Sequence, residues 1–69
     1  MATSNEELQQ LNMEVVQLYQ NGEYSEATKL AIQALKFGEE SLGRKHPITA
    51  TSINNLAILN NKMGEQVRA

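Results

Sequence analysis

Few side chains in this sequence are of the types that carry out acid–base or metal chemistry. His46 is the single histidine, cysteine is absent, and the acidic residues include the adjacent pairs Glu6-Glu7 and Glu39-Glu40. Catalysis needs a nucleophile beside a base, two acids in a shielded site, or ligands grouped around a metal. Neighbouring residues on a helix point in different directions, so each glutamate pair is expected to be solvated. His46 precedes Pro47 and is expected to belong to a helix-start turn, so we expect no enzyme activity, no metal and no cofactor.

The chain is small and mildly acidic. Its 69 residues suffice for one domain, 1–69, whose single core would supply only about 3 to 5 kcal/mol of stability. Without cysteine the chain has no disulfide and no thiolate metal site, and a reducing compartment fits as well as any other. The six basic residues are scattered and the formal net charge is −2, which argues against nucleic acid or an acidic membrane surface as the main partner. No signal peptide and no apolar run approaching the ~20 residues of a membrane span is evident, so a cytoplasmic location is expected.

Three stretches have the period of an amphipathic helix, and none has the alternation of a strand. The first, about 5–20, begins at Ser4-Asn5-Glu6-Glu7, which has the Ser-x-x-Glu form of a capping box. It ends at Asn21-Gly22, two residues that tolerate the left-handed conformation found after helices. Its apolar side chains recur at spacings of three and four: Leu8, Leu11, Val15, Leu18 and Tyr19.

The second and third helices are predicted at about 24–42 and 47–63. Gly43 would end the second and Gly64 the third, while Pro47 suits a first helical turn because it has no N–H to leave unpaired. Ile32 and Phe37 lie off the second helix's main stripe, so this helix is expected to have neighbours on two sides. The stripes are Ala27, Leu30, Ala31, Ala34, Leu35, Gly38 and Leu42 for the second helix, and Ile53, Leu56, Ala57, Asn60 and Met63 for the third.

The sequence also matches itself at an offset of 42 residues, the separation of Gly22 from Gly64. Each match alone is weak, but together they place a helix, a glycine and the start of the next helix at equivalent positions in both copies. This pattern is typical of helical hairpins that stack on one another. The matching pairs are Leu11 with Ile53, Asn12 with Asn54, Gly22-Glu23 with Gly64-Glu65, and Ala27 with Ala69.

Several short motifs lie between Gly22 and Leu59, and their order and spacing fit one pattern without insertions or deletions. They are Gly22-Glu23-Tyr24-Ser25-Glu26-Ala27, Ala34-Leu35, Leu42-Gly43, His46-Pro47, Thr49-Ala50 and Ile53-Asn54-Asn55-Leu56-Ala57. In these residues the chain resembles the tetratricopeptide repeat, in particular its longer variety seen in kinesin light chains and many bacterial proteins. Such a repeat consists of two antiparallel helices, A and B. The resemblance implies an all-α fold of antiparallel hairpins from a tetratricopeptide-type solenoid, with about one and a half repeats in three helices.

The resemblance further implies a non-enzymatic module that binds a protein or peptide, because stacked A helices form a concave groove. Asn12 and Asn54 are repeat-equivalent, and an amide row could pair with a peptide backbone. Alternatively, these amides only keep the helix surfaces hydrated or pair with neighbouring helix termini. Tyr19 and Ile58 would then pack in the core or at its edge. The implied groove positions are Gln9, Asn12, Val16, Tyr19 and Gln20 on the first helix, with Thr51, Asn54, Asn55, Ile58, Asn61 and Lys62 on the third.

A second hypothesis is self-association. Three helices leave an apolar flank of the third uncovered, and a repeat that cannot bury its face alone is expected to recruit another copy. We expect a two-fold homodimer, with exchange of helices as a variant because short hairpin turns can open. A further alternative is a fragment of a longer repeat array, which the end at Ala69 inside a motif supports. The candidate self-association residues are Ile53, Leu56, Ala57, Leu59 and Met63.

Overall fold

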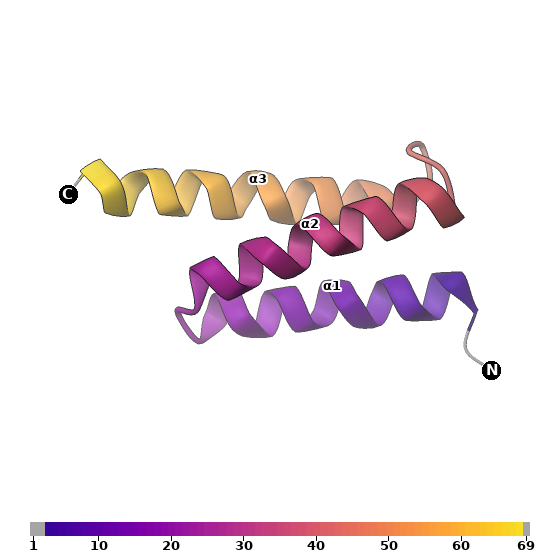
Figure 1. Ribbon diagram of the computed structural model, residues 1–69, viewed down its shortest axis with the longest axis horizontal. Coiled ribbons are helices and arrows are strands. Elements are labelled where there is room, and N and C mark those ends of the chain that lie inside the picture. The colour runs from indigo at the N-terminus through magenta and orange to yellow at the C-terminus, as the bar shows by residue number, and fades with distance from the viewer. Residues whose placement is uncertain (1–2, 69) are drawn as a thin grey trace.

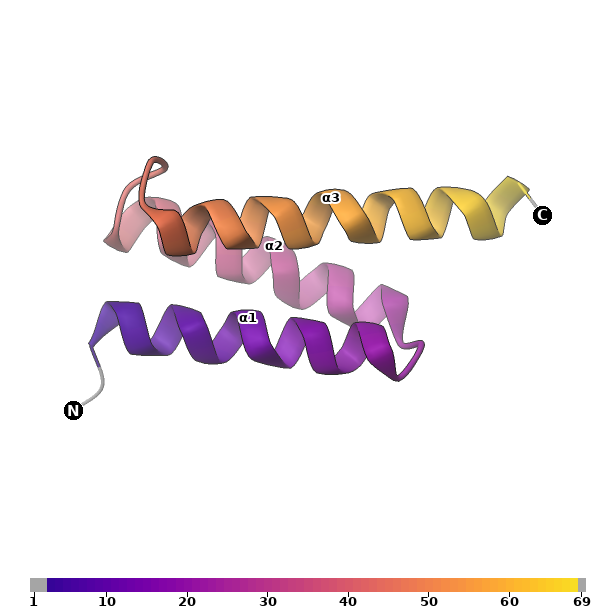
Figure 2. The same ribbon diagram turned by 180° about the vertical axis from the view of Figure 1, so that it is seen from behind.

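Three α-helices make up the computed structural model, which describes the backbone of residues 3–68 and the side-chain surroundings of residues 3–65. They are α1 (Ser4–Gln20), α2 (Tyr24–Ser41) and α3 (Pro47–Arg68), and this part of the chain contains no strand. α1 and α3 run in the same direction, and α2 runs opposite to both (Figure 1). Seen from the other side, α1 and α3 form one layer with α2 behind it (Figure 2). The predicted all-α arrangement of antiparallel hairpins is confirmed.

The start of α1 is capped one residue earlier than the sequence analysis predicts. Thr3 is the N-cap, and its hydroxyl accepts a hydrogen bond from the Glu6 N–H at 3.2 Å. The same hydroxyl donates to the Glu6 carboxylate at 3.2 Å. The sequence offers two overlapping motifs of this form, beginning at Thr3 and at Ser4. The structure uses the first, so Ser4 is already helical.

Both turns rely on a glycine in the left-handed region, Gly22 with φ of 80° and Gly43 with φ of 92°. The Gly43 N–H donates to the Gly38 carbonyl at 3.0 Å and so closes the end of α2. His46 then starts α3, because its ring nitrogen Nδ1 accepts from the Ile48 N–H at 3.2 Å and its carbonyl accepts from the Ala50 N–H at 3.0 Å. His46 therefore has the structural role expected from its place beside Pro47.

The core lies between the small-residue face of α2 and the apolar faces of α1 and α3. Alanines on α2 let the other two helices approach closely, and Gly38 marks the tightest point. A Cβ at Gly38 would lie 2.8 Å from Thr49 Oγ1 and 2.9 Å from Leu8 Cδ2. The buried apolar residues are Leu8, Val15, Ala27, Ala31, Ala34 and Leu59.

The buried face of α3 differs from the predicted stripe. Thr49 and Ser52 are fully buried, whereas Ala57 and Asn60 from the predicted stripe are exposed. Thr49 lies against Gly38, whose lack of a side chain leaves room for it. An apolar pattern misses this face because two of its members are small polar residues.

The prediction that Gly64 ends the third helix is wrong, because α3 continues to Arg68. A glycine inside a helix costs only about 1 kcal/mol relative to alanine, so it does not by itself stop one. At Gly22 the helix that follows, α2, packs back on α1 and fixes the turn. The described residues contain no helix after α3 that packs back on it in the same way. The last turns of α3 extend past the ends of the other helices (Figure 1).

Candidate functional site

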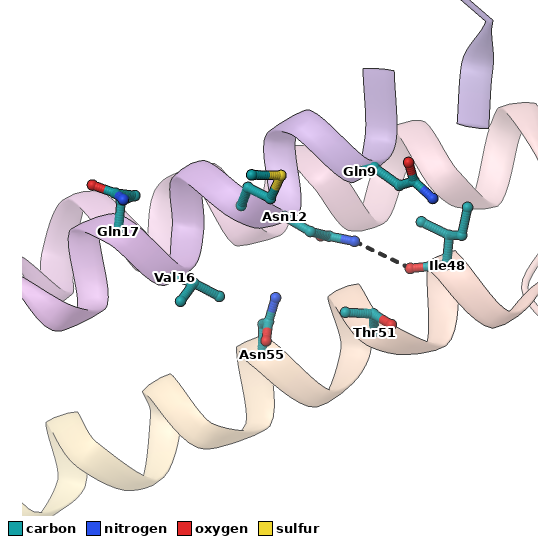
Figure 3. Close-up of a pocket in the computed structure, with 8 residues that line it drawn as sticks. Gln9, Asn12, Val16, Gln17, Ile48, Thr51 and Asn55 are labelled. Carbon is teal, nitrogen blue, oxygen red and sulfur yellow. Dashed lines mark hydrogen bonds between the residues drawn. The ribbon is translucent and has the colours of Figure 1, made fainter. Parts of the chain in front are cut away.

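A groove runs between α1 and α3, and all of its lining residues come from these two helices. It consists of two adjoining hollows of about 490 and about 220 Å³ that share Val16 and Asn55. Figure 3 looks into the larger hollow. Gln9, Asn12, Met13, Val16, Gln17, Ile48, Thr51 and Asn55 line the larger hollow, and Val15, Val16, Tyr19, Gln20, Asn55, Ile58 and Leu59 line the smaller one.

Asn12 ties the two walls of this groove together. Its Nδ2 donates to the Ile48 carbonyl at 3.2 Å, and its Oδ1 accepts from the Ser52 hydroxyl at 2.7 Å. The side chain is only 6% exposed. Both halves of the amide are thus occupied by the first turns of α3, as one of the two sequence-based interpretations expected. Asn12 positions the groove walls and has little surface to offer a ligand.

The floor and walls of the groove expose several large apolar side chains. Met13 is 69% exposed, Val16 is 41% exposed, and Ile58 is 43% exposed. Polar but uncharged side chains surround them, among them Gln9, Gln17 and Thr51. No residue that lines either hollow carries a charge. The groove is therefore an apolar surface with an amide and hydroxyl rim.

Asn55 lies where the two hollows meet. Its side chain extends from α3 toward α1, near Val16 (Figure 3). The Asn55 Nδ2 atom is buried and has no hydrogen-bond partner among the described residues. Unlike Asn12, it is a donor left unsatisfied at the edge of an open hollow, and such a group is costly unless it finds an acceptor.

Tyr19 combines both roles that were considered for it. Its ring lies 5.4 Å from the ring of Tyr24, centroid to centroid, in a tilted arrangement, and it packs against the core cluster that contains Val15 and Leu59. Tyr19 also lines the smaller hollow. It is therefore a packed side chain with one surface turned to the groove.

The predicted groove residues divide into two groups. Asn54, Asn61 and Lys62 on α3 line neither hollow, because each step along a helix rotates the side chain by about 100° and the groove face of α3 follows Ile48, Thr51, Asn55 and Ile58. Lys62 Nζ instead lies 3.8 Å from the Glu65 carboxylate. The predicted residues that do line the groove are Gln9, Asn12, Val16, Tyr19, Gln20, Thr51, Asn55 and Ile58.

Five lining residues were not among the predicted groove positions: Met13, Gln17 and Ile48 in the larger hollow, and the core residues Val15 and Leu59 in the smaller one. Met13 and Gln17 flank the predicted positions Asn12 and Val16 on the same helix face, so a wider arc of that face would have included them. Ile48 could be found only from the way the first turn of α3 meets α1.

The predicted self-association residues do not form one exposed face. Leu59 is 1% exposed and lies in the core with Val15, which corrects its placement on an uncovered flank. Leu56 is half-buried against the same core, and the Met63 sulfur lies 3.2 Å from the Thr28 hydroxyl of α2. Ile53 is half-buried. Ala57 is the one member of this set whose side chain is exposed.

Metal ligands do not gather anywhere in the part of the chain that the structure describes: no three His, Cys, Asp or Glu side chains come together there. Across residues 3–68, none of the three helices is both long and apolar enough to cross a bilayer.

Comparison with known proteins agrees with this arrangement of helices. A family model described as Tetratricopeptide repeat matches residues 14–69. The match covers most of the chain, which therefore belongs to the tetratricopeptide repeat family, a family of protein-interaction modules. Searches of curated proteins and of solved structures gave no match.

Proposed function

We propose that this chain binds a peptide segment of another protein in the groove between α1 and α3. One observation carries the proposal. Of the four large apolar side chains that the described residues expose, three line the groove, Met13, Val16 and Ile58, and only Ile32 lies elsewhere. Apolar side chains that gather on one surface with a polar rim mark interaction sites.

Random-peptide display on the intact chain supplies a probe for this proposal, and aspartate substitutions then test where the selected peptides bind. Val16→Asp and Ile58→Asp place a charge inside the groove, so each is expected to weaken binding at least about tenfold, which corresponds to about 1.4 kcal/mol. Both side chains are exposed in the free chain, so the fold should tolerate the change.

Ile32→Asp is the matched control. Ile32 is 47% exposed, close to the values for Val16 and Ile58, but it lies on α2 and lines neither hollow. Binding by this variant should equal that of the unaltered chain. Loss with Ile32→Asp and retention with Val16→Asp would place the binding surface on α2 and contradict the proposal.

A second function, self-association through the flank of α3, has one specific observation in its favour. Val15 and Ala57 are equivalent at the 42-residue offset, yet Val15 is 1% exposed in the core while Ala57 is exposed. The flank of α3 thus has two small residues, Ala57 and Gly64, that would allow close helix packing, with Asn60 between them, but no helix lies on it among the described residues.

Sedimentation tests this second function. If the flank pairs with another copy, the chain should sediment as a dimer at micromolar concentrations and Ala57→Arg should convert it to a monomer of equal helicity, because a long charged side chain prevents close helix approach. A fully helical monomer at high micromolar concentration would contradict self-association, including helix exchange. That result would favour the alternative that this chain is a fragment of a longer repeat array.

Several finer expectations remain proposals. We infer a non-enzymatic role in the cytoplasm, with a protein partner rather than nucleic acid or membrane, on the basis of the scattered basic residues and the uncharged groove. Membership of the longer, kinesin-light-chain-like variety rests on the 42-residue offset. Cell fractionation and co-purification of the native chain would test the location and the class of partner.

A further inference from the structure

We propose that Met13 is a site of oxidation by peroxides, and that its conversion to the sulfoxide closes the groove to apolar peptides. The second half of this inference rests on the proposed function, since it concerns the regulation of the same groove. The first half, the selective oxidation of Met13, is measurable on the chain alone.

Met13 is the most exposed of the large apolar side chains in the described part of the molecule. It is 69% exposed, against 47% for Ile32, the next in order. It lines the larger hollow of the groove, on α1. A dissolved oxidant can therefore reach this thioether without any opening of the fold.

The sulfur of Met63 differs from that of Met13. Met63 is half-buried on α3, and the Thr28 hydroxyl of α2 donates a hydrogen bond to its sulfur at 3.2 Å. A lone pair that accepts a hydrogen bond is less available to attack an oxidant, and the packed helices limit access to it. Met63 is thus an internal control that should react more slowly than Met13.

The modification transfers one oxygen atom and two electrons. A sulfur lone pair of Met13 attacks one oxygen of hydrogen peroxide, so an S–O bond forms and the O–O bond breaks. The hydroxide that leaves takes the proton from the new S–OH group and becomes water. Sulfur is oxidised, peroxide is reduced, and a flexible apolar side chain becomes a polar sulfoxide.

A sulfoxide in this hollow opposes the binding of an apolar peptide. Its oxygen is hydrated in the free chain, and a peptide that covers it removes that water. The residues that line the two hollows include no Lys or Arg to pair with the oxygen instead. Oxidation should therefore weaken peptide binding at least about tenfold.

The helices themselves should tolerate the change. Met13 and Asn55 are equivalent at the 42-residue offset, and both line the larger hollow. The groove face of α3 thus already carries a polar side chain at this position of the repeat. Because Met13 is mostly exposed, it also contributes little to the core.

Peptide mapping by mass spectrometry after brief treatment with dilute hydrogen peroxide tests the selectivity. Met13 should gain one oxygen several-fold faster than Met63, and the helicity measured by circular dichroism should not change. Equal rates at the two residues, or loss of helicity when Met13 is oxidised, would overturn the inference.

The effect on the groove is measured with a display-selected peptide that contains no methionine, before and after peroxide treatment and removal of the oxidant. The unaltered chain and Met63→Leu should each lose at least about tenfold in affinity. Met13→Leu, whatever its starting affinity, should have the same affinity before and after treatment, because it lacks the thioether.

Unchanged affinity of the unaltered chain once Met13 is oxidised, or an equal loss in Met13→Leu, would overturn the inference while groove binding remained. Failure to select any peptide would instead overturn the proposed function and, with it, the second half of this inference.

Discussion

Asn12 fixes the relative position of α1 and α3 through both halves of its amide. Its place on the groove face could be predicted from the repeat, but its partners could not. Ser52 lies 40 residues away in sequence and Ile48 lies 36 away. The residues around Ser52 do not indicate that its hydroxyl donates to the Asn12 side chain, because that hydrogen bond depends on how α3 packs against α1. The same long-range dependence explains why Thr49 and Ser52 were missed as buried residues.

A double-mutant cycle should show that Asn12 and Ser52 act together. Asn12→Ala leaves the buried Ser52 hydroxyl with only its longer bond to the Ile48 carbonyl, at 3.5 Å, and should lower the free energy of unfolding by about 1–3 kcal/mol. Ser52→Ala should cost about 1 kcal/mol, and the two changes should couple by about 1 kcal/mol in urea unfolding. Asn54→Ala, at the equivalent but exposed position, should stay within about 0.5 kcal/mol of the unaltered chain. Additive effects of the two core changes would show that the bond contributes nothing.

At the scale of the helix, local signals predicted starts and turns well and predicted the end of α3 poorly. Gly22 and Gly43 end helices because the chain reverses there and the reversal needs a positive φ. Gly38 and Gly64 are glycines inside helices, one required by close packing and the other in open space. Sequence pattern alone does not distinguish a glycine that ends a helix from one inside a helix, because the difference depends on which parts of the fold surround each glycine.

Gly38→Ala and Gly64→Ala should therefore have opposite effects on stability. The added methyl at Gly38 would meet Thr49 and Leu8, so α2 would have to shift away and the free energy of unfolding should fall by about 1–3 kcal/mol. A methyl group added at Gly64 would meet no atom within 4 Å apart from its own helix, so alanine should raise stability by about 0.5–1 kcal/mol through helix propensity. Chemical denaturation measures both. Destabilisation by Gly64→Ala would indicate that α3 turns at Gly64 after all.

At the scale of the whole molecule, the repeat pattern predicted the fold class and most of the α1 wall of the groove. The α3 wall was half wrong, since Asn55 and Ile58 face α1 while Asn54, Asn61 and Lys62 do not. The rotation of α3 about its own axis is set by Thr49 beneath Gly38 and by Ser52 against Asn12. These contacts involve small polar residues that carry no hydrophobic signal, so the orientation could be obtained only from the structure.

The four isoleucines of the chain lie on different faces and together test the central proposal in one measurement. Ile48 and Ile58 line the groove, Ile32 is exposed on α2, and Ile53 is half-buried on α3 outside the groove. Methyl NMR of isoleucine-labelled chain, titrated with a display-selected peptide, should shift the signals of Ile48 and Ile58 and leave those of Ile32 and Ile53 in place. Shifts of Ile32 or Ile53 with Ile48 and Ile58 unmoved would contradict binding in the groove between α1 and α3.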